Sequence, residues 1–581
     1  MSLAPRTVDT DILILGSGGA GLFAALHAKK TAPDLDVTVA VKGLLGKCGC
    51  TRMVQGGYNV ALAPGDSVER HFMDTIEGGK WLNDQDLAWT LVTEAQIRIR
   101  ELESELGCFF DRNPDGTVHQ KAFAGQTFDR TVHKGDLTGI EIINRLAEQV
   151  WRRDVRRLED HRALELIPAA DGSGLAGVLM LDMRSGAPLL VRARAVLLAT
   201  GGGPTMYRYH TPSGDKTCDG LAMALRAGLP LRDMEMVQFH PTGLLAGTGT
   251  RMTGTVLEEG LRGAGGWLLD ATGERFMQAV DERAERTTRD IVSRSILRRI
   301  RAGFASPNGG VYIQMSHLGP DHVRRSFKGM VERCADCGFD LAGGRVEVVP
   351  TAHYMMGGVV FEADGRTALP RLFAAGEDTG GVHGANRLGG NGVANSTVFG
   401  GLAGQAMARA VPRAGAHAEP DRAAIEAGLA RAYGPLGRSA ADLGAIREAL
   451  YGVMWDDVGI LRDAAGLSRA MTTLGGLAEA VARAGAPDGD RRYNLTWMDR
   501  LNLENLILVS QTICAAALAR TDSRGAHFRE DHPETSDLDT SHYTVVRQGN
   551  GDLAGGDLAV SLEPVHFTHV RPGRSLLDAA A

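Results

Sequence analysis

Cysteine is scarce in this chain. Only seven cysteines occur among its 581 residues, and they are scattered along the sequence. An odd, scattered set favours reduced thiols in a cytosolic enzyme over a disulfide framework. Cys334 and Cys337 form one CxxC pair without a second pair. We therefore interpret both as core thiols and expect no zinc or iron–sulfur site within this chain.

Positive charge and long apolar runs are also lacking. The chain carries 63 Lys and Arg against 70 Asp and Glu, a net charge of -7, whereas a nucleic-acid surface needs clustered cations. No apolar run reaches the roughly 20 residues that span a bilayer, and residues 1–10 are too short and too polar for a signal peptide. We expect a cytoplasmic protein that binds no nucleic acid and does not itself insert into a membrane.

Glycine, in contrast, is abundant. Hydrophobic residues make up 44% of the chain, which excludes a disordered protein and suits three or four domains with a large core. The 75 glycines among 581 residues are about 13%, close to double the usual ~7%. They cluster in a few loops, which indicates backbone pressed against a ligand.

Apolar runs that end in glycines predict an α/β arrangement. Residues 11–15 read as a strand closed by glycines, residues 22–30 as a helix, and residues 37–41 as a second strand. The runs 195–202 and 372–377 are of the same kind. Since the carboxyl ends of parallel strands meet at one edge of a sheet, we expect these ends to gather at a ligand.

The remaining segments differ in pattern. Residues 236–352 mix turns with a helix and predict an inserted domain, residues 401–520 show helical periodicity, and residues 531–581 are polar, glycine-rich and strand-like. Helices are predicted over 283–301, 423–433, 440–454 and 501–519. The last segment is expected to wrap back over the fold.

A glycine loop follows the first strand. Gly16, Gly18 and Gly21 form GxGxxG directly before the first helix. Glycines let the backbone approach a pyrophosphate, and the helix N-terminus offers unpaired N–H groups. The alternative is a glycine turn without a ligand. About twenty residues on, where an acidic residue usually holds a ribose, the strand ends in Lys42 and Gly43, so NAD is the weaker choice of dinucleotide.

Further motifs follow in order along nearly the whole chain. They lie at 16–21, 50–57, 239–243, 259–262, 273–277, 289–294, 350–358, 376–377, 383–391 and 524–529. With these motifs the sequence resembles the flavoprotein subunit of succinate dehydrogenase and fumarate reductase, a family that also includes L-aspartate oxidase.

The resemblance implies an α/β fold with four parts. These are a doubly wound, Rossmann-like FAD-binding domain (1–235 and 353–405), an inserted α+β capping domain (236–352), a helical domain (406–530) and a C-terminal strand-like tail (531–581). It also implies FAD as the cofactor. The positions matching cofactor contacts are Gly16, Gly18, Gly19, Ala20, Gly21, Lys42, Gly43, Cys50, Thr51, Gln55, Gly56, Gly57, Thr200, Gly201, Asp219, Glu377 and Asn391. Glu377 would accept from a ribose hydroxyl, or it is an N-cap or surface acid.

The resemblance also assigns the substrate side. His240, His353 and Arg387 would hold the substrate carboxylates, because Arg offers a planar fork matched to carboxylate and His donates a hydrogen bond. A lone His such as His240 could instead be a satisfied core residue. Three further positions join this set: Thr242, Phe123 and Glu258.

Arg289 is implied as the group that protonates or deprotonates the substrate carbon, connected to solvent through Glu259 and Arg262. Arginine normally stays charged, and a second cation beside it and exclusion of water would both disfavour that charge. Apart from the resemblance, Arg289 reads as a surface helix residue paired with Glu285 at i,i+4.

Cys50 marks a departure from the family. Members with covalent FAD attach it through a His at this position, so His-linked FAD is excluded here. We expect non-covalent FAD, while linkage through the Cys50 thiolate stays open. A flavin without the covalent bond favours reduction of an alkene or transfer of electrons to a strong acceptor.

Glu258 is a second departure, because the family has a Thr there that binds a substrate carboxylate. A carboxylate facing another is unfavourable unless one is protonated or a cation intervenes. Either Glu258 points away, or the substrate is not the plain four-carbon diacid. Cys218 and Gly392 also replace a family Gly and Ser and indicate a divergent branch.

The predicted function is FAD-dependent interconversion of fumarate and succinate, or of a close dicarboxylate analogue. Hydride would pass through flavin N5 and the proton through Arg289. Phe123 favours this type over L-aspartate oxidase, which has an acidic residue there. The chain would be the catalytic subunit beside an iron–sulfur protein, and partner subunits could bring it to a membrane. Alternatives are an aspartate oxidase-like enzyme, a soluble biosynthetic flavin dehydrogenase with an altered substrate, and a non-catalytic dinucleotide-binding scaffold.

Overall fold

The computed structural model describes residues 4–247, 249–250, 252–549 and 557–578. Within these residues the largest sheet has the strand order β6-β2-β1-β9-β8-β7, with β16 paired to β9. Its strands are β1 (Arg6–Leu15), β2 (Val37–Val41), β6 (Arg156–Glu159), β7 (His161–Pro168), β8 (Leu175–Asp182), β9 (Ala187–Leu198) and β16 (Leu372–Ala374). The pairs β1–β2, β1–β9 and β9–β16 are parallel, which confirms the arrangement predicted from the runs that end in glycines. The antiparallel β7 and β8 were not predicted.

Helix α1 (Gly19–Thr31) follows β1 and packs closely against α10 (Asn391–Ala410). Glycines of α10 make this approach possible. A Cβ on Gly400 would lie 2.5 Å from the carbonyl oxygen of Ala20, and one on Gly404 would lie 2.3 Å from that of Ala24. The helix predicted over 22–30 is confirmed, although it begins three residues earlier.

A second sheet, with the order β11-β14-β13-β12, forms the cap together with its helices. The cap comprises β11 (Val237–Leu244), α6 (Gly260–Gly263), β12 (Trp267–Leu269), α7 (Arg289–Arg301), β13 (Val311–Gln314), α8 (Pro320–Ser326), α9 (Lys328–Ala335) and β14 (Arg345–Met355). Cys334 is buried in its apolar core, and Cys337 packs against that core. The helix predicted from 283 begins at Arg289, because residues 284–286 form a 3-10 turn and Thr288 is extended.

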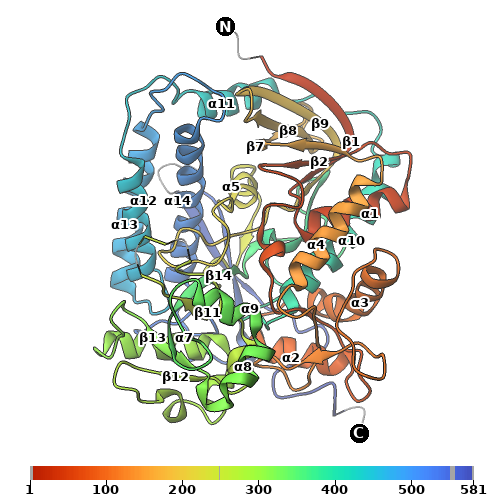
Figure 1. Ribbon diagram of the computed structural model, residues 1–581. Helices are drawn as coiled ribbons and strands as arrows, with labels where there is room; N and C mark the ends of the chain where they lie inside the picture. The colour runs from red at the N-terminus through yellow and green to blue at the C-terminus, as the bar shows by residue number, and fades with distance from the viewer. Residues whose placement is uncertain (1–3, 248, 251, 550–556, 579–581) are drawn as a thin grey trace.

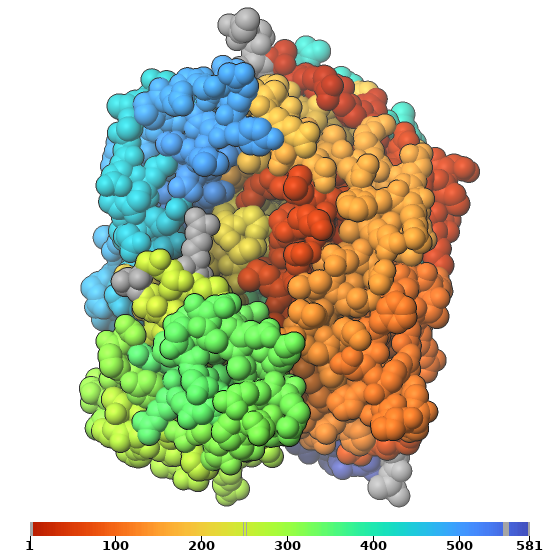
Figure 2. Space-filling model, viewed as in Figure 1, coloured from red at the N-terminus to blue at the C-terminus, as the bar shows by residue number. Residues whose placement is uncertain are grey.

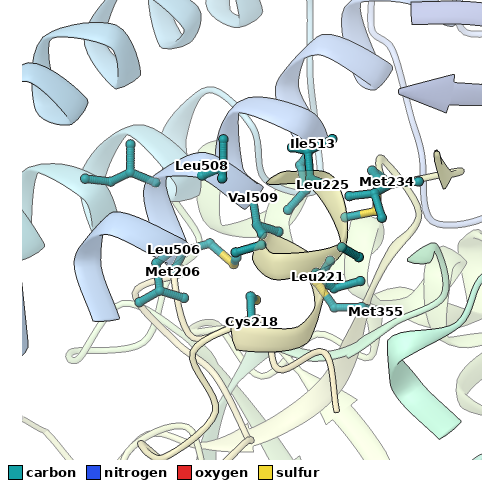
Figure 3. Packing of buried hydrophobic residues seen from close by; sticks show 14 of the residues in the cluster. Met206, Cys218, Leu221, Leu225, Met234, Met355, Leu506, Leu508, Val509 and Ile513 are labelled. Carbon is teal, nitrogen blue, oxygen red and sulfur yellow. The ribbon is translucent and has the colours of Figure 1, made fainter. Parts of the chain in front are cut away.

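Helices α12 (Leu443–Asp456), α13 (Ala464–Arg483) and α14 (Leu495–Ala519) stand together on the left of Figure 1. With α11 (Arg422–Tyr433) they confirm the helical region, although α13 was not predicted. Leu221 and Leu225 of α5 (Asp219–Arg226) lie in one apolar cluster with Val509 and Ile513 of α14 (Figure 3). By length and composition alone α14 could cross a membrane, but 78% of its most apolar window is buried inside the protein.

The C-terminal tail contributes two strands to a third sheet. Here β17 (His542–Gln548) pairs with β18 (Leu558–Pro564) and with β10 (Leu231–Arg232), which also pairs with β15 (Gly358–Val359). This return over the fold confirms the strand-like tail. The remaining α-helices and strands of the described residues are α2 (Val68–Gly78), α3 (Gln85–Ser104), α4 (Thr138–Trp151), β3 (Tyr58–Asn59), β4 (Gln120–Lys121) and β5 (Thr131–Val132). The domain limits at 235, 352, 405 and 530 stay predictions, and β14 runs across the one at 352.

Candidate active site

The glycine loop holds β1, β9 and α1 tightly together. Gly16 has a φ of +112°, and a Cβ there would lie 2.1 Å from the carbonyl oxygen of Ala199. A Cβ on Gly21 would lie 2.0 Å from the carbonyl oxygen of Gly16. Gly18 and Gly19 instead line a cavity at the N-terminus of α1. The first and last glycines therefore serve packing, and the middle ones leave room for a ligand.

This cavity has a volume of about 480 Å³ and lies between the glycine loop and the cap. A smaller cavity of about 70 Å³ continues it, and both are lined by Gly18, Gly201 and Lys216. Figure 2 shows a hollow on this face, bordered below by the green cap and on the right by the red N-terminal segment.

Most of the predicted site residues meet here. Those lining the larger cavity are Gly18, Gly19, Ala20, Cys50, Thr51, Gln55, Gly56, Gly57, Phe123, Gly201, His240, Glu258, Glu259, Arg289, His353, Glu377 and Arg387. Those added by the smaller cavity are Gly16, Lys42, Thr200 and Asp219. Two joined cavities with bare glycine backbone and Lys216 at their junction fit an FAD molecule, whose pyrophosphate would lie at the N-terminus of α1.

Arg289 is the first residue of α7 and is buried rather than exposed on a helix surface. Its Nη2 and Nε donate to Oε2 of Glu259 at 2.5 and 3.2 Å, and its Nη1 donates to Oε1 of Gln238 at 2.9 Å. Its ion-pair partner is thus Glu259, not the Glu285 suggested by helical spacing. Arg262 donates to Oε1 of the same carboxylate at 3.0 Å.

Burial and ion pairing set the pKa values of the charged groups around Arg289. Burial alone would raise the pKa of Glu259, but Arg289 and Arg262 outweigh it and hold that pKa at about 2. Glu259 is therefore a carboxylate at any working pH. Burial, followed by the nearby Arg289, lowers the pKa of Arg387 to about 10.

His240 and His353 come from the paired strands β11 and β14, with ring centroids 5.4 Å apart. Burial, and then the charge of Arg289, lowers the pKa of both imidazoles well below its usual value. Nδ1 of His353 shares a 2.8 Å hydrogen bond with the hydroxyl of Thr211. Both rings are therefore neutral hydrogen-bonding groups at the cavity wall.

Arg387 lies on the loop that precedes α10, with its guanidinium over the ring of Tyr354 at 4.3 Å. Its Nη1 makes only a long contact, 3.4 Å, to the carbonyl oxygen of Leu388. Among the described residues its buried Nε has no hydrogen-bond partner. A buried guanidinium with unused donors is suited to an anion.

At the cofactor end, Lys42 and Arg162 donate to the carboxylate of Asp219 at 2.9 and 2.8 Å. Cys50 lines the larger cavity, and burial raises the pKa of its thiol to about 12. Cys50 is therefore a thiol at neutral pH, which is the unreactive form for attachment to a flavin.

Several predicted residues line neither cavity. Thr242 donates from its hydroxyl to the carbonyl oxygen of Leu257 at 2.9 Å, and Gly43 packs against Cys48. Asn391 lines neither cavity, and its side chain makes hydrogen bonds to its neighbours. Its partners are Asn59, His71 and Thr75. Gly21 packs against the backbone of Gly16, and Arg262 donates a hydrogen bond to Glu259, so both support residues that line the cavities.

Other residues of the site were not predicted. Gln238 accepts from Arg289 and donates to the carbonyl oxygen of Arg387 at 2.7 Å. A Cβ on Gly389 would lie 2.5 Å from Oε2 of Glu259 and 3.0 Å from Nη2 of Arg289. Lys216 donates to the carbonyl oxygen of Thr200 at 2.5 Å. No motif distinguishes Gln238 or Lys216, while Gly389 lies inside the motif at 383–391.

This fold and site define a flavoprotein oxidoreductase. A family model described as "FAD binding domain" matches residues 11–393, and one described as "Fumarate reductase flavoprotein C-term" matches residues 447–576. The chain belongs to the family of flavoprotein subunits of fumarate reductase and succinate dehydrogenase, which confirms the resemblance. It is an FAD-dependent oxidoreductase of the fumarate reductase type.

Curated relatives and solved structures support this membership. The chain is 41% identical to a subunit of the fumarate reductase (CoM/CoB) of Methanothermobacter marburgensis, covering 91% of this chain and 95% of the relative. It is 32% identical to the fumarate reductase flavoprotein subunit of Escherichia coli, covering 99% and 97%. A structure of a variant of E. coli quinol fumarate reductase has a TM-score of 0.91 and 31% identity, covering 98% and 99%.

Proposed function

We propose that this chain interconverts fumarate and succinate, or a close dicarboxylate analogue, with Arg289 moving the proton. The observation that carries the proposal is the convergence of His240, Arg289, His353 and Arg387 on one cavity beside the glycine loop. These groups come from two strands, a helix and a loop. A packing role alone would not require them to share a cavity wall.

Each residue has a distinct task in the proposal. Arg387 has donors to spare for a substrate carboxylate, and the neutral His240 and His353 add hydrogen bonds. Glu259 holds the guanidinium of Arg289 in place through two contacts and connects it to Arg262. When bound, FAD supplies the two-electron carrier that exchanges hydride with the substrate.

We further propose that FAD is held without a covalent bond. Cys50 lies at the cavity wall, but its thiol is protonated at neutral pH because burial raises its pKa to about 12. The residues that would hold FAD are then those of the glycine loop, with Lys42 and Glu377. Acid precipitation checks this, because non-covalent FAD leaves its colour in the supernatant and covalent FAD colours the pellet.

An iron–sulfur protein is the proposed electron partner. The relatives named above are described as subunits, and in the described part of the chain no group of three His, Cys, Asp or Glu could hold a metal ion. In the proposal, electrons enter and leave the chain through this partner. We infer a cytoplasmic location, with attachment to a membrane through partner subunits.

Anaerobic spectroscopy tests the proposed reaction. Succinate added to the oxidised holoenzyme should bleach the flavin absorbance, and fumarate added to the dithionite-reduced enzyme should restore it. L-Aspartate serves as the competing substrate, and the position of Phe123 on the cavity wall predicts little response to it. Bleaching by aspartate but not by succinate would favour the oxidase instead.

A further inference from the structure

The two guanidiniums on the cavity wall are held in different ways. Arg289 donates to the carboxylate of Glu259 at 2.5 and 3.2 Å, so its charge is balanced within the protein. Arg387 instead has the ring of Tyr354 as its neighbour, with the ring centroid 4.3 Å from the guanidinium carbon. Among the described residues no carboxylate accepts a hydrogen bond from Arg387, whose Nη1 makes only the 3.4 Å contact to Leu388. An aromatic ring therefore takes the place that a carboxylate has beside Arg289.

The ring of Tyr354 is itself fixed at its far end. Its hydroxyl accepts from Nδ2 of Asn395 in α10 at 3.2 Å and lies 3.5 Å from Nε2 of His383. The imidazole of His383 also packs edge-on against the ring, with centroids 5.4 Å apart and an interplanar angle of 79°. Burial raises the pKa of the Tyr354 hydroxyl, so the phenol is neutral at any working pH. The ring thus presents a fixed, uncharged face to Arg387.

One glycine leaves room for this pair. Gly392 is the second residue of α10 and lines the same cavity. A Cβ there would lie 2.9 Å from Nη1 of Arg387 and 3.3 Å from Cε2 of Tyr354. The guanidinium and the ring therefore fill the space that a side chain at this position would occupy. Arg387 and Tyr354 also line the cavity, so their contact lies beside the ligand space.

The nature of the partner decides what Arg387 can offer to a ligand. The face of an aromatic ring attracts a cation without supplying a negative charge. A carboxylate partner would neutralise Arg387 and would compete with an incoming anion for its N–H donors. The contact with Tyr354 therefore orients Arg387, while its buried Nε keeps no hydrogen-bond partner within the described part of the chain.

We propose that Tyr354 is a positioning residue, which holds the guanidinium of Arg387 through a cation–π contact and so keeps its charge and its donors free for a substrate carboxylate. This inference rests on the proposed function, because it assigns a supporting residue to the anion-binding Arg387. Tyr354 acts through Arg387 and needs no contact of its own with the substrate. Loss of the ring should therefore weaken anion binding more than it slows turnover.

Equilibrium binding of malonate tests the inference. Malonate carries two carboxylates but lacks the adjacent pair of CH2 groups that the proposed reaction oxidises, so it binds without turnover. Its dissociation constant is measured on the oxidised holoenzyme from the change in flavin absorbance. Tyr354→Leu should weaken this binding by about tenfold, and Tyr354→Phe, which keeps the ring, should recover most of that loss. In fumarate reduction the Leu variant should raise KM by a similar factor, while kcat changes by less than about threefold.

A series of fluorinated rings separates attraction from packing. Fluorine withdraws electron density from the ring face and changes its volume little, so the attraction for a cation falls stepwise when Tyr354 is replaced by phenylalanine and by its mono- and trifluorinated forms. Malonate affinity should fall in the same order, by about threefold or more over the series. This readout does not require Tyr354→Leu to fold, and flavin content and melting temperature verify each variant.

The cap offers a matched control for the loss of a tyrosine ring beside an arginine. The ring of Tyr312 lies 6.0 Å from the guanidinium of Arg345, and neither residue lines a cavity of the site. Tyr312→Leu should therefore bind malonate as tightly as the wild-type protein.

The pH dependence of malonate binding gives a second readout. Besides Tyr354, the titratable groups around Arg387 are Arg289, Glu259, Glu377, His240, His353 and His383. Burial, and then Arg289, lowers the pKa of Arg387 to about 10, so wild-type affinity should fall as the pH rises through that value. Without the ring the cation loses a stabilising contact, so in Tyr354→Leu this fall should occur about one pH unit lower. Tyr354→Phe should keep the wild-type profile, which excludes ionisation of the hydroxyl as its cause.

The outcomes distinguish the inference from the proposed function. If wild-type enzyme binds no malonate and neither succinate nor fumarate changes the flavin absorbance, the proposed function itself is wrong. If wild type binds malonate, but the Leu variant and the trifluorinated ring bind it as tightly as Tyr354→Phe, the ring does not position Arg387 and the inference is overturned. A tenfold loss with an unshifted alkaline profile also contradicts it, because the ring would then act by packing alone.

Discussion

The cofactor side and the substrate side of the cavity are built from different chemical material. Around Gly18, Gly19 and Gly201 the wall is largely main chain, placed by strand ends and a helix N-terminus. Around Arg289 and Arg387 the wall consists of charged side chains that hold one another in place. The cofactor wall accommodates a ligand because its glycines have no side chains. The substrate wall depends on each charged side chain keeping its hydrogen-bond partner.

The largest expected effect lies on the substrate side. Arg289→Lys keeps a positive charge but loses the fork that contacts both Glu259 and Gln238. We expect turnover of fumarate to fall by about a hundred- to ten-thousandfold, the range for loss of a positioned acid or base. Flavin content should stay unchanged.

Steady-state fumarate reduction with a reduced viologen dye measures this loss. The matched control is Arg301→Lys on the same helix, where the exposed side chain pairs with Glu530 at 3.3 Å. Near wild-type turnover in the Arg289 variant would end its assignment as the proton-transfer group.

A smaller loss of activity is expected from a substitution at Gly389. A Cβ on Gly389 would collide with Glu259, with Phe123 and with Arg289 at 2.5, 2.7 and 3.0 Å. Gly389→Ala should lower kcat/KM by about ten- to a hundredfold, because the added methyl group must push Glu259 and Arg289 out of position and such overpacking costs about 1–3 kcal/mol. Gly476→Ala in α13, where nothing lies within 4 Å of the added Cβ, is the control and should keep full activity. Equal activity in both variants would show that the loop at Gly389 yields without moving Arg289.

Acid should weaken the folded state through the buried histidines. His240 and His353 have a pKa far below the ordinary value because of burial and neighbouring arginines. Below about pH 6.5 these two histidines are protonated in the unfolded chain but stay neutral in the folded protein. The free energy of unfolding therefore falls by about 1.4 kcal/mol per pH unit for each histidine.

Urea unfolding of the holoenzyme at pH 7.5 and 5.5 measures this dependence. His240→Gln should shrink the difference in unfolding free energy between the two pH values by about 1.4 kcal/mol. The exposed His322→Gln is the control and should leave that difference unchanged. A wild-type protein equally stable at both pH values would contradict the expectation.

The smallest effect is expected at Cys50, on the cofactor side. Cys50→Ala removes a half-buried thiol without a charge, so turnover should change by less than about threefold and the flavin should still bind. A large loss of turnover, or colour that moves from pellet to supernatant in the variant, would instead identify a covalent link.

This contrast also explains what the sequence could predict. Strand ends such as 11–15 carry apolar runs and glycines, which are local signals, and so the parallel sheet and the glycine loop were found. The start of α7 was misplaced, because the extended Thr288 interrupts a stretch with helical composition. The antiparallel β7 and β8 depend on partners distant in sequence and carry no comparable signal.

The site follows the same division. His240, Arg289, His353 and Arg387 were gathered by resemblance, and the structure places them on one cavity wall. Gln238 could not be found from sequence, because its role exists only through side-chain partners on other elements. Conversely, Thr242 and Asn391 were predicted to bind substrate and cofactor, but their side chains make hydrogen bonds to neighbouring protein groups instead.

The amide of Gln238 has one further consequence. It belongs to the cap strand β11, accepts from Arg289 of α7 and donates to the carbonyl oxygen of Arg387 on the loop before α10. One planar group thus sets the spacing between the residue that handles the proton and the residue that grips the anion. A shift of the cap relative to the FAD-binding part would break both hydrogen bonds of Gln238. Proton transfer and substrate binding should therefore be lost together when these hydrogen bonds are removed.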